Sequence, residues 1–120
     1  LHNTLFPYTT LFRSLDGHLE NVWVETRDGL DPDDAMAAMR EVPSLDLPSS
    51  QIPLITTFAA PDRPQPRLDR LVGDGMGIAV GGFQPTPFGL QYNCLAHNTI
   101  RGAAGASLLN GELLAEEGWV

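Results

Sequence analysis

The chain has 120 residues, of which 42% are hydrophobic, and this is enough for one domain with a modest core. Its formal net charge of -8 at pH 7 argues against nucleic acid or an anionic membrane as a partner, and no apolar run is long enough to span a bilayer. The single cysteine, Cys94, excludes an intramolecular disulfide and a multi-cysteine metal site. We therefore expect a cytoplasmic protein without a metal centre.

The first residues of the chain look foreign to the rest. Thr4–Ser14 matches, codon for codon, the in-frame translation of a common short-read sequencing adapter. We therefore expect residues 1–14 to be a non-native tag, residues 15–120 to be one native domain fragment, and the native protein to extend upstream of Leu15. The alternative interpretation is a genuine strand rich in Phe, Tyr and Thr, interrupted by Pro7.

The next segment predicts a strand, a turn and a helix. Residues His18–Thr26 alternate along the chain and are rich in β-branched and aromatic side chains, which favours a strand, and Asp28-Gly29 marks a turn. Asp31 is a suitable N-cap for a helix over Pro32–Val42, with one apolar stripe along it. Pro43 is expected to end this helix.

The middle of the chain predicts little regular structure. Ser44–Pro53 has the composition of a loop, and Leu54–Phe58 is a short candidate strand. Ala60–Arg70 contains three prolines interleaved with arginines, so we expect it to be extended and irregular.

The last third predicts a hairpin followed by a long helix. Met76–Gln84 and Leu90–Ala96 read as two strands joined by a turn around Pro85–Gly89, and Ile100–Glu117 reads as a helix that begins with small residues. The order of elements indicates an α+β fold, with a mainly antiparallel sheet, helices on one face and a long C-terminal helix.

Three candidate sites have an ordinary structural explanation. The glycines of Gly75-x-Gly77-x-x-x-Gly81 lead into a strand, so they are expected to be turn glycines and close-packed strand glycines and not a dinucleotide-binding loop. Cys94 lies within a strand with no cation nearby in sequence, which favours a buried structural thiol. His97 is three residues further on, and on a strand the two side chains point to opposite faces.

Two other positions have sharper chemical interpretations. His18 and Glu20 share a strand face, so His18 could be a general base oriented by a carboxylate, although composition alone favours a surface histidine. Asn98 or Thr99 is expected to cap the C-terminal helix, whose small first turns suggest close packing against another helix or, less often, a ligand.

Four segments together resemble a known enzyme family. Leu15–His18, Asp62–Arg70, His97–Ser107 and Glu112–Leu114 are similar, in order, to aspartate-semialdehyde dehydrogenases of the archaeal and fungal branch. The resemblance implies a glyceraldehyde-3-phosphate-dehydrogenase-like C-terminal domain, truncated upstream of its nucleophile and inactive alone. It also implies a homodimer or homotetramer that uses NADP and takes a small-molecule substrate and phosphate.

The resemblance also implies roles for two residues. The family interconverts aspartyl phosphate and aspartate semialdehyde through a cysteine nucleophile, in lysine, threonine and methionine biosynthesis. Its acid/base histidine falls at His18, and a cofactor contact falls at Asn98. Cys94 does not match the nucleophile's motif, and the family's substrate-binding arginine would fall at Leu11, inside the tag. Malonyl-CoA reductase of the same branch and a non-catalytic dimerisation module are the alternatives.

Overall fold

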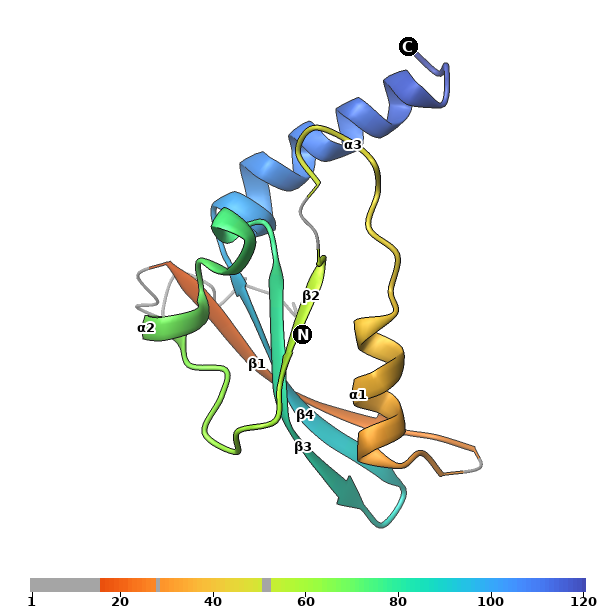
Figure 1. Ribbon diagram of the computed structural model, residues 1–120, viewed down its shortest axis with the longest axis vertical. Coiled ribbons are helices and arrows are strands. Elements are labelled where there is room, and N and C mark those ends of the chain that lie inside the picture. The colour runs from red at the N-terminus through yellow and green to blue at the C-terminus, as the bar shows by residue number, and fades with distance from the viewer. Residues whose placement is uncertain (1–15, 28, 51–52) are drawn as a thin grey trace, which may run out of the picture.

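A four-stranded sheet forms the centre of the molecule (Figure 1). The computed structural model describes residues 16–27, 29–50 and 53–120, so the predicted tag, residues 1–14, lies outside the described residues. The strand order is β1-β4-β3-β2, with β1 over Gly17–Glu25, β2 over Ile55–Phe58, β3 over Ile78–Thr86 and β4 over Gly89–His97. Only β2 runs parallel to its neighbour, so the sheet is mainly antiparallel.

The predicted hairpin is confirmed, with a tighter turn than expected. Strands β3 and β4 pair as far as Thr86 opposite Gly89, so only Pro87 and Phe88 remain in the turn. A register shift between Gly81 and Gln84 interrupts the ladder. The buried core of the sheet lies at the end of the hairpin away from the turn, on both faces of β3 and β4. It contains Ala79, Val80 and Leu95, and Leu90 is buried nearer the turn.

Helix α1, Pro32–Arg40, begins as the sequence predicts. The Asp31 carboxylate accepts a hydrogen bond from the backbone N of Asp33 at 2.8 Å, which satisfies one of the free donors of the first turn. The helix ends two residues before the predicted Val42, which is exposed. Arg40 donates from Nε to the Thr57 hydroxyl at 2.5 Å, so α1 lies over the sheet face that carries Thr57.

The segment between β2 and β3 corrects one expectation. We predicted no regular structure over Ala60–Arg70, but Pro66–Asp69 forms a single helical turn, α2. The reason is that Pro66 stands at the start of this turn, where a missing N–H costs nothing and the fixed φ favours the helix. A tight turn, Val72–Gly75, then leads into β3, so Gly75 and Gly77 are the turn glycines that the sequence predicts.

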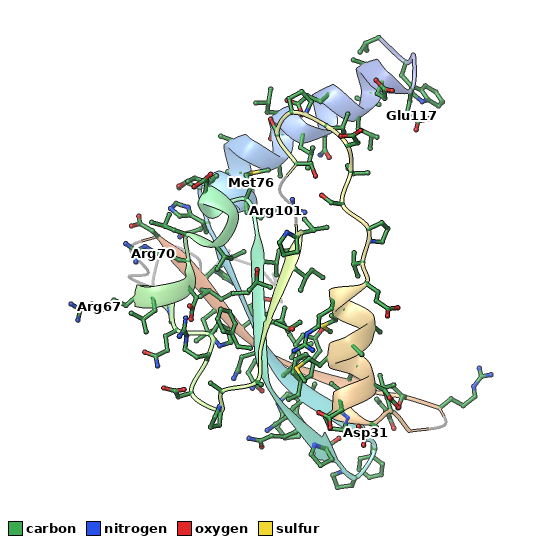
Figure 2. All side chains as sticks on the ribbon, in the orientation of Figure 1. Asp31, Arg67, Arg70, Met76, Arg101 and Glu117 are labelled. Carbon is green, nitrogen blue, oxygen red and sulfur yellow. The ribbon has the colours of Figure 1, made fainter. Side chains whose placement is uncertain are left out.

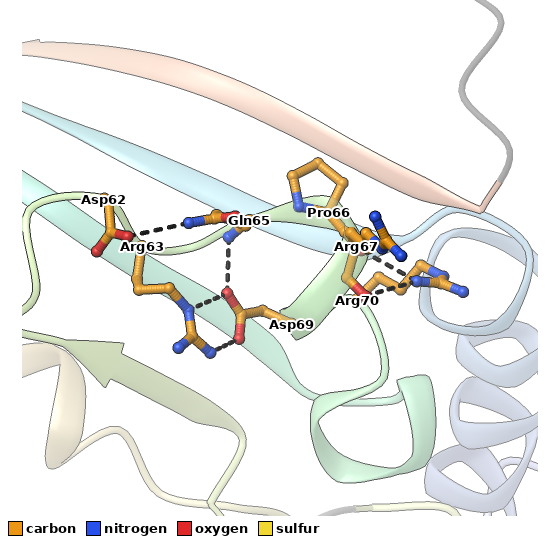
Figure 3. Close-up of polar contacts among 7 residues, drawn as sticks. All are labelled: Asp62, Arg63, Gln65, Pro66, Arg67, Asp69 and Arg70. Carbon is orange, nitrogen blue, oxygen red and sulfur yellow. Dashed lines mark hydrogen bonds and ion pairs between the residues drawn. The ribbon is translucent and has the colours of Figure 1, made fainter.

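An ion pair in the interior holds this segment together (Figure 3). Asp69 is 1% exposed and accepts hydrogen bonds from the Arg63 guanidinium and from the backbone N of Gln65 at 2.6 Å. The hydrogen bond from Arg63 holds the pKa of the Asp69 carboxyl below its usual value. The loop lies directly on the sheet, because a Cβ at Gly81 would come within 2.5 Å of the Arg63 carbonyl oxygen.

The predicted C-terminal helix is confirmed, although its first turn differs. Residues Ile100–Ala104 form a wider π-helical turn, and α3 continues over Gly105–Glu116 and extends away from the sheet (Figure 1). Met76 lies beneath the start of this helix (Figure 2), and its Sδ occupies the space that a Cβ at Gly105 would need. The small residue at this position therefore serves close packing.

The far part of α3 has little contact with the sheet. Glu112 accepts hydrogen bonds from Ser49, from the backbone N at 2.9 Å and from the hydroxyl at 2.7 Å, and these tie the loop after α1 to the helix. Leu109 is buried, whereas Leu108 and Leu114 are exposed.

None of the helices in the described ranges is both long and apolar enough to cross a membrane. The predicted α+β fold class is confirmed.

Replacing Asp69 with asparagine tests the interior ion pair. Asp69→Asn leaves the Arg63 guanidinium and Gln65 N–H without their charged acceptor, so we expect the free energy of unfolding at pH 7 to fall by about 1–3 kcal/mol. Asp62→Asn is the matched control, because Asp62 lies on the same loop but is exposed. Urea denaturation of both variants measures the difference, and equal midpoints would contradict a stabilising role for the pair.

The same carboxyl predicts a dependence of stability on pH. Because its pKa is lowered in the folded chain, the unfolded chain takes up a proton first as the pH falls below the ordinary value of 3.8. We therefore expect stability to be lost progressively below that pH, down to the folded pKa. Asp69→Asn lacks this carboxyl. We therefore expect its denaturation midpoint to fall less steeply with pH across that range than the midpoint of the unchanged chain.

Candidate active site

A concave site of about 310 Å³ lies where the beginning of β1 meets the end of β4. Its lining residues come from both strands and from the turn that follows β4: His18, Glu20, Cys94, Ala96, His97, Asn98 and Gly102. Both residues that the sequence singled out for chemistry, His18 and Asn98, are therefore brought to one site. A second hollow of about 520 Å³ lies beside the hairpin turn and contains neither of them.

His18 and Glu20 form a hydrogen-bonded pair on β1. The Nε2 atom of His18 lies 2.8 Å from Oε1 of Glu20, and about half of each side chain is exposed. An ionised carboxylate can only accept, so Nε2 carries the proton in this pair and Nδ1 is left to exchange one. This arrangement can orient an imidazole for acid/base chemistry.

Cys94 lies directly across from Glu20 in the β1–β4 register. Burial raises the pKa of its thiol, and the Glu20 charge raises it further. The thiol is therefore protonated at neutral pH, which does not suit a nucleophile. The sequence did not predict that Cys94 lines the same site as His18, because strand register cannot be read from one strand alone.

The start of the C-terminal helix refines a second expectation. Thr99, one of the two expected residues, stands at the N-cap position, but its side chain accepts no capping hydrogen bond. His97 Nδ1 instead accepts from the backbone N atoms of Thr99 and Ile100. The Asn98 backbone N instead donates to the Asp16 carbonyl oxygen at 2.9 Å. Asp16 is the residue before β1, so the turn after β4 is tied to the strand that carries His18.

The side chain of Asn98 has an unused acceptor. Its Oδ1 is buried, and among the described residues it has no hydrogen-bond partner. A buried carbonyl oxygen without a donor is costly, so this atom is suited to accept a hydrogen bond from a ligand or from another part of a longer protein. Within the described part of the chain, no group of three His, Cys, Asp or Glu side chains could hold a metal ion.

Known proteins resemble the chain in both sequence and structure. It is 50% identical over 104 residues to aspartate-semialdehyde dehydrogenase from Archaeoglobus fulgidus, covering 86% of this chain and 30% of the relative. It is 35% identical over 124 residues to malonyl-CoA reductase (NADP) from Metallosphaera sedula, covering 98% and 35%. No family model matches.

A solved structure agrees with these relatives. The crystal structure of aspartate-semialdehyde dehydrogenase with NADP from Candida albicans superposes with a TM-score of 0.74 at 32% identity, covering 88% of this chain and 31% of that one. The matched proteins are thus oxidoreductases. More narrowly, the chain is similar to a segment of aspartate-semialdehyde dehydrogenases, and it spans about a third of the length of these relatives.

The state of Cys94 can be tested by alkylation. Because its thiol has a raised pKa, we expect iodoacetamide at pH 7.5 to modify the folded chain much more slowly than the same chain in urea. Intact-mass spectrometry over time measures both rates, and Cys94 is the chain's only cysteine. Equal rates in the folded and unfolded chain would contradict a half-buried thiol with a raised pKa.

Proposed function

We propose that the chain is part of an NADP-dependent aspartate-semialdehyde dehydrogenase, which reductively dephosphorylates aspartyl phosphate to aspartate semialdehyde. The single observation that carries the proposal is that His18 and Asn98 line one site in a chain 50% identical to such an enzyme. The proposal includes phosphate as the group released in this direction and the co-substrate of the reverse reaction, together with a homodimer or homotetramer and a cytoplasmic location. The segment alone is inactive in this proposal, because the nucleophilic cysteine lies elsewhere in the enzyme.

His18 is the acid/base residue of the proposed reaction. Glu20 accepts the hydrogen bond from Nε2–H and so holds the ring in one tautomer and orientation. Nδ1 then takes or gives the proton of the substrate oxygen as the bond between substrate carbon and cysteine sulfur forms and breaks. The pair is exposed in this chain, which leaves room for a substrate to reach it.

NADP is the proposed cofactor, and its reduced form, NADPH, would supply the hydride in the reductive direction. Asn98 would hold it, and the buried Oδ1 without a partner fits this role because a carbonyl oxygen accepts hydrogen bonds from amide or hydroxyl groups. Gly102 lines the same site and has no side chain to obstruct a ligand. The matched Candida albicans structure is a complex with NADP.

Malonyl-CoA reduction is the second candidate function. It is supported by the malonyl-CoA reductase relative, whose match extends over 98% of the chain. The same His18 chemistry would serve either substrate, since both reactions reduce an activated acyl group to an aldehyde. A non-catalytic dimerisation module is the alternative outside enzymes, and loss of activity on removing His18 would argue against it.

A chimeric enzyme tests the proposal. Residues 15–120 of this chain would replace the corresponding segment of the Archaeoglobus fulgidus relative, which supplies the missing part. We expect NADPH-dependent turnover of aspartyl phosphate, and in His18→Ala a loss of kcat of about 10²–10⁴-fold, the usual contribution of a general acid/base residue. Turnover is followed by NADPH absorbance with aspartyl phosphate and with malonyl-CoA in parallel.

Two further variants control for the substitution itself. Glu25→Gln changes an exposed carboxylate at the other end of β1, and we expect it to leave kcat unchanged. Glu20→Gln keeps an acceptor but removes its charge, and we expect a loss smaller than that of His18→Ala. Full activity of His18→Ala in an active chimera would overturn the assignment of this residue.

A further inference from the structure

His97, the last residue of β4, is a buried histidine to which the proposed chemistry gives no role. It is 7% exposed. Its Nδ1 lies 3.3 Å from the backbone N of Thr99 and 3.2 Å from that of Ile100, and the Thr99 hydroxyl lies 3.3 Å from the same atom. Since a backbone N–H can only donate, Nδ1 must be the acceptor in these contacts.

These contacts select one tautomer of the ring. An acceptor nitrogen of imidazole carries no hydrogen, so they favour the tautomer with its hydrogen on Nε2. A protonated Nδ1 would face two N–H donors at the positive end of the helix and would lose both hydrogen bonds. The geometry therefore favours the tautomer of His97 that carries its hydrogen on Nε2 and accepts at Nδ1.

The bonds of His97 close a short loop around Asn98. The Nδ1 acceptor bonds the residues two and three positions further on, which are the N-cap residue Thr99 and the first helical residue Ile100. The spacing is that of an N-cap side chain, although His97 stands two positions before the N-cap. Asn98 lies inside this closed loop. Its backbone is held on one side by the cap and on the other by its hydrogen bond to the Asp16 carbonyl oxygen.

The same junction is connected to β1. His97 pairs with Gly17, and Ala96 pairs with His18, so the strand end that carries the cap lies next to the strand that carries the proposed acid/base residue. The Asp16 carboxylate lies 3.5 Å from Nε of Arg70, which connects this corner to the end of α2. A change at His97 is therefore expected to move Asn98 relative to His18 and not merely to loosen α3.

We propose that His97 is a positioning residue, whose Nδ1 cap fixes the Asn98 turn in the orientation that binds the cofactor. The part that concerns cofactor binding rests on the proposed function, whereas the tautomer and the cap do not. In this role His97 acts through Asn98, although its side chain also lines the candidate site. The effect should consequently appear in the binding of NADPH more than in the chemical step.

A matched pair of substitutions separates the cap from the shape of the side chain. In His97→Asn, Oδ1 branches from the same carbon as Nδ1 does in histidine, and asparagine is among the preferred N-caps. In His97→Leu, a methyl group branches from that position and cannot accept a hydrogen bond. The two variants thus differ mainly in whether the cap can form.

The kinetic test uses the active chimera. We expect His97→Leu to raise the KM for NADPH about tenfold, in line with the loss of a typical N-cap, with kcat changed by less than about twofold. His97→Asn should restore most of the affinity. An unchanged KM in His97→Leu, or an equal rise in both variants, would overturn the proposal.

A spectroscopic test does not depend on activity. In ¹⁵N-histidine-labelled chain, or in the chimera if the chain alone does not fold, the His97 signal is assigned by its absence in His97→Asn. We expect Nδ1 to resonate as an unprotonated nitrogen and Nε2 as a protonated one, and the reverse would overturn the cap. An inactive chimera with the expected tautomer would count against the proposed function but leave the cap supported.

Discussion

Antiparallel pairing between β1 and β4 is the constraint on which the candidate site depends. Nine consecutive residue pairs join these strands, from Gly17 opposite His97 to Glu25 opposite Gly89. This register places His18 and Glu20 beside Ala96 and Cys94, and it brings the turn after β4 next to them. A shift of one residue would send His18 to the other face of the sheet, away from Asn98.

Besides helix α1, a loop supports the sheet at β3. Arg63 and Asp69 fix this loop from within, and its backbone approaches Gly81 so closely that no side chain fits there. The loop continues into α2 and ends at Arg70, whose guanidinium lies beside Asp16. The interior ion pair is therefore linked to the start of β1 through a short stretch of ordered backbone, which helps to hold the corner where the candidate site lies.

Much of the fold could be predicted because its signals are local. The Asp31 cap, the hairpin and the C-terminal helix each follow from neighbouring residues. His18 and Asn98 were predicted as site residues from the resemblance to a known family. The expectations that were wrong needed contacts over a distance or an unusual partner. A histidine that caps from two positions before the N-cap has no sequence signature, and the contact between Asp69 and Arg63 that holds the turn after Pro66 could not be read from the sequence. The position of Cys94 in the site required the strand register.

The distance along the chain between paired residues has a consequence for folding. Asn21 and Asn93, which meet through a side-chain hydrogen bond across β1 and β4, are 72 positions apart. Closing so long a loop costs entropy before the pairing of the strands can compensate, whereas the β3–β4 hairpin closes over two residues. The hairpin is thus expected to form early and β1 to join it late. The geometry of the site arises in that last step, so a newly made chain has no site until β1 has docked against β4.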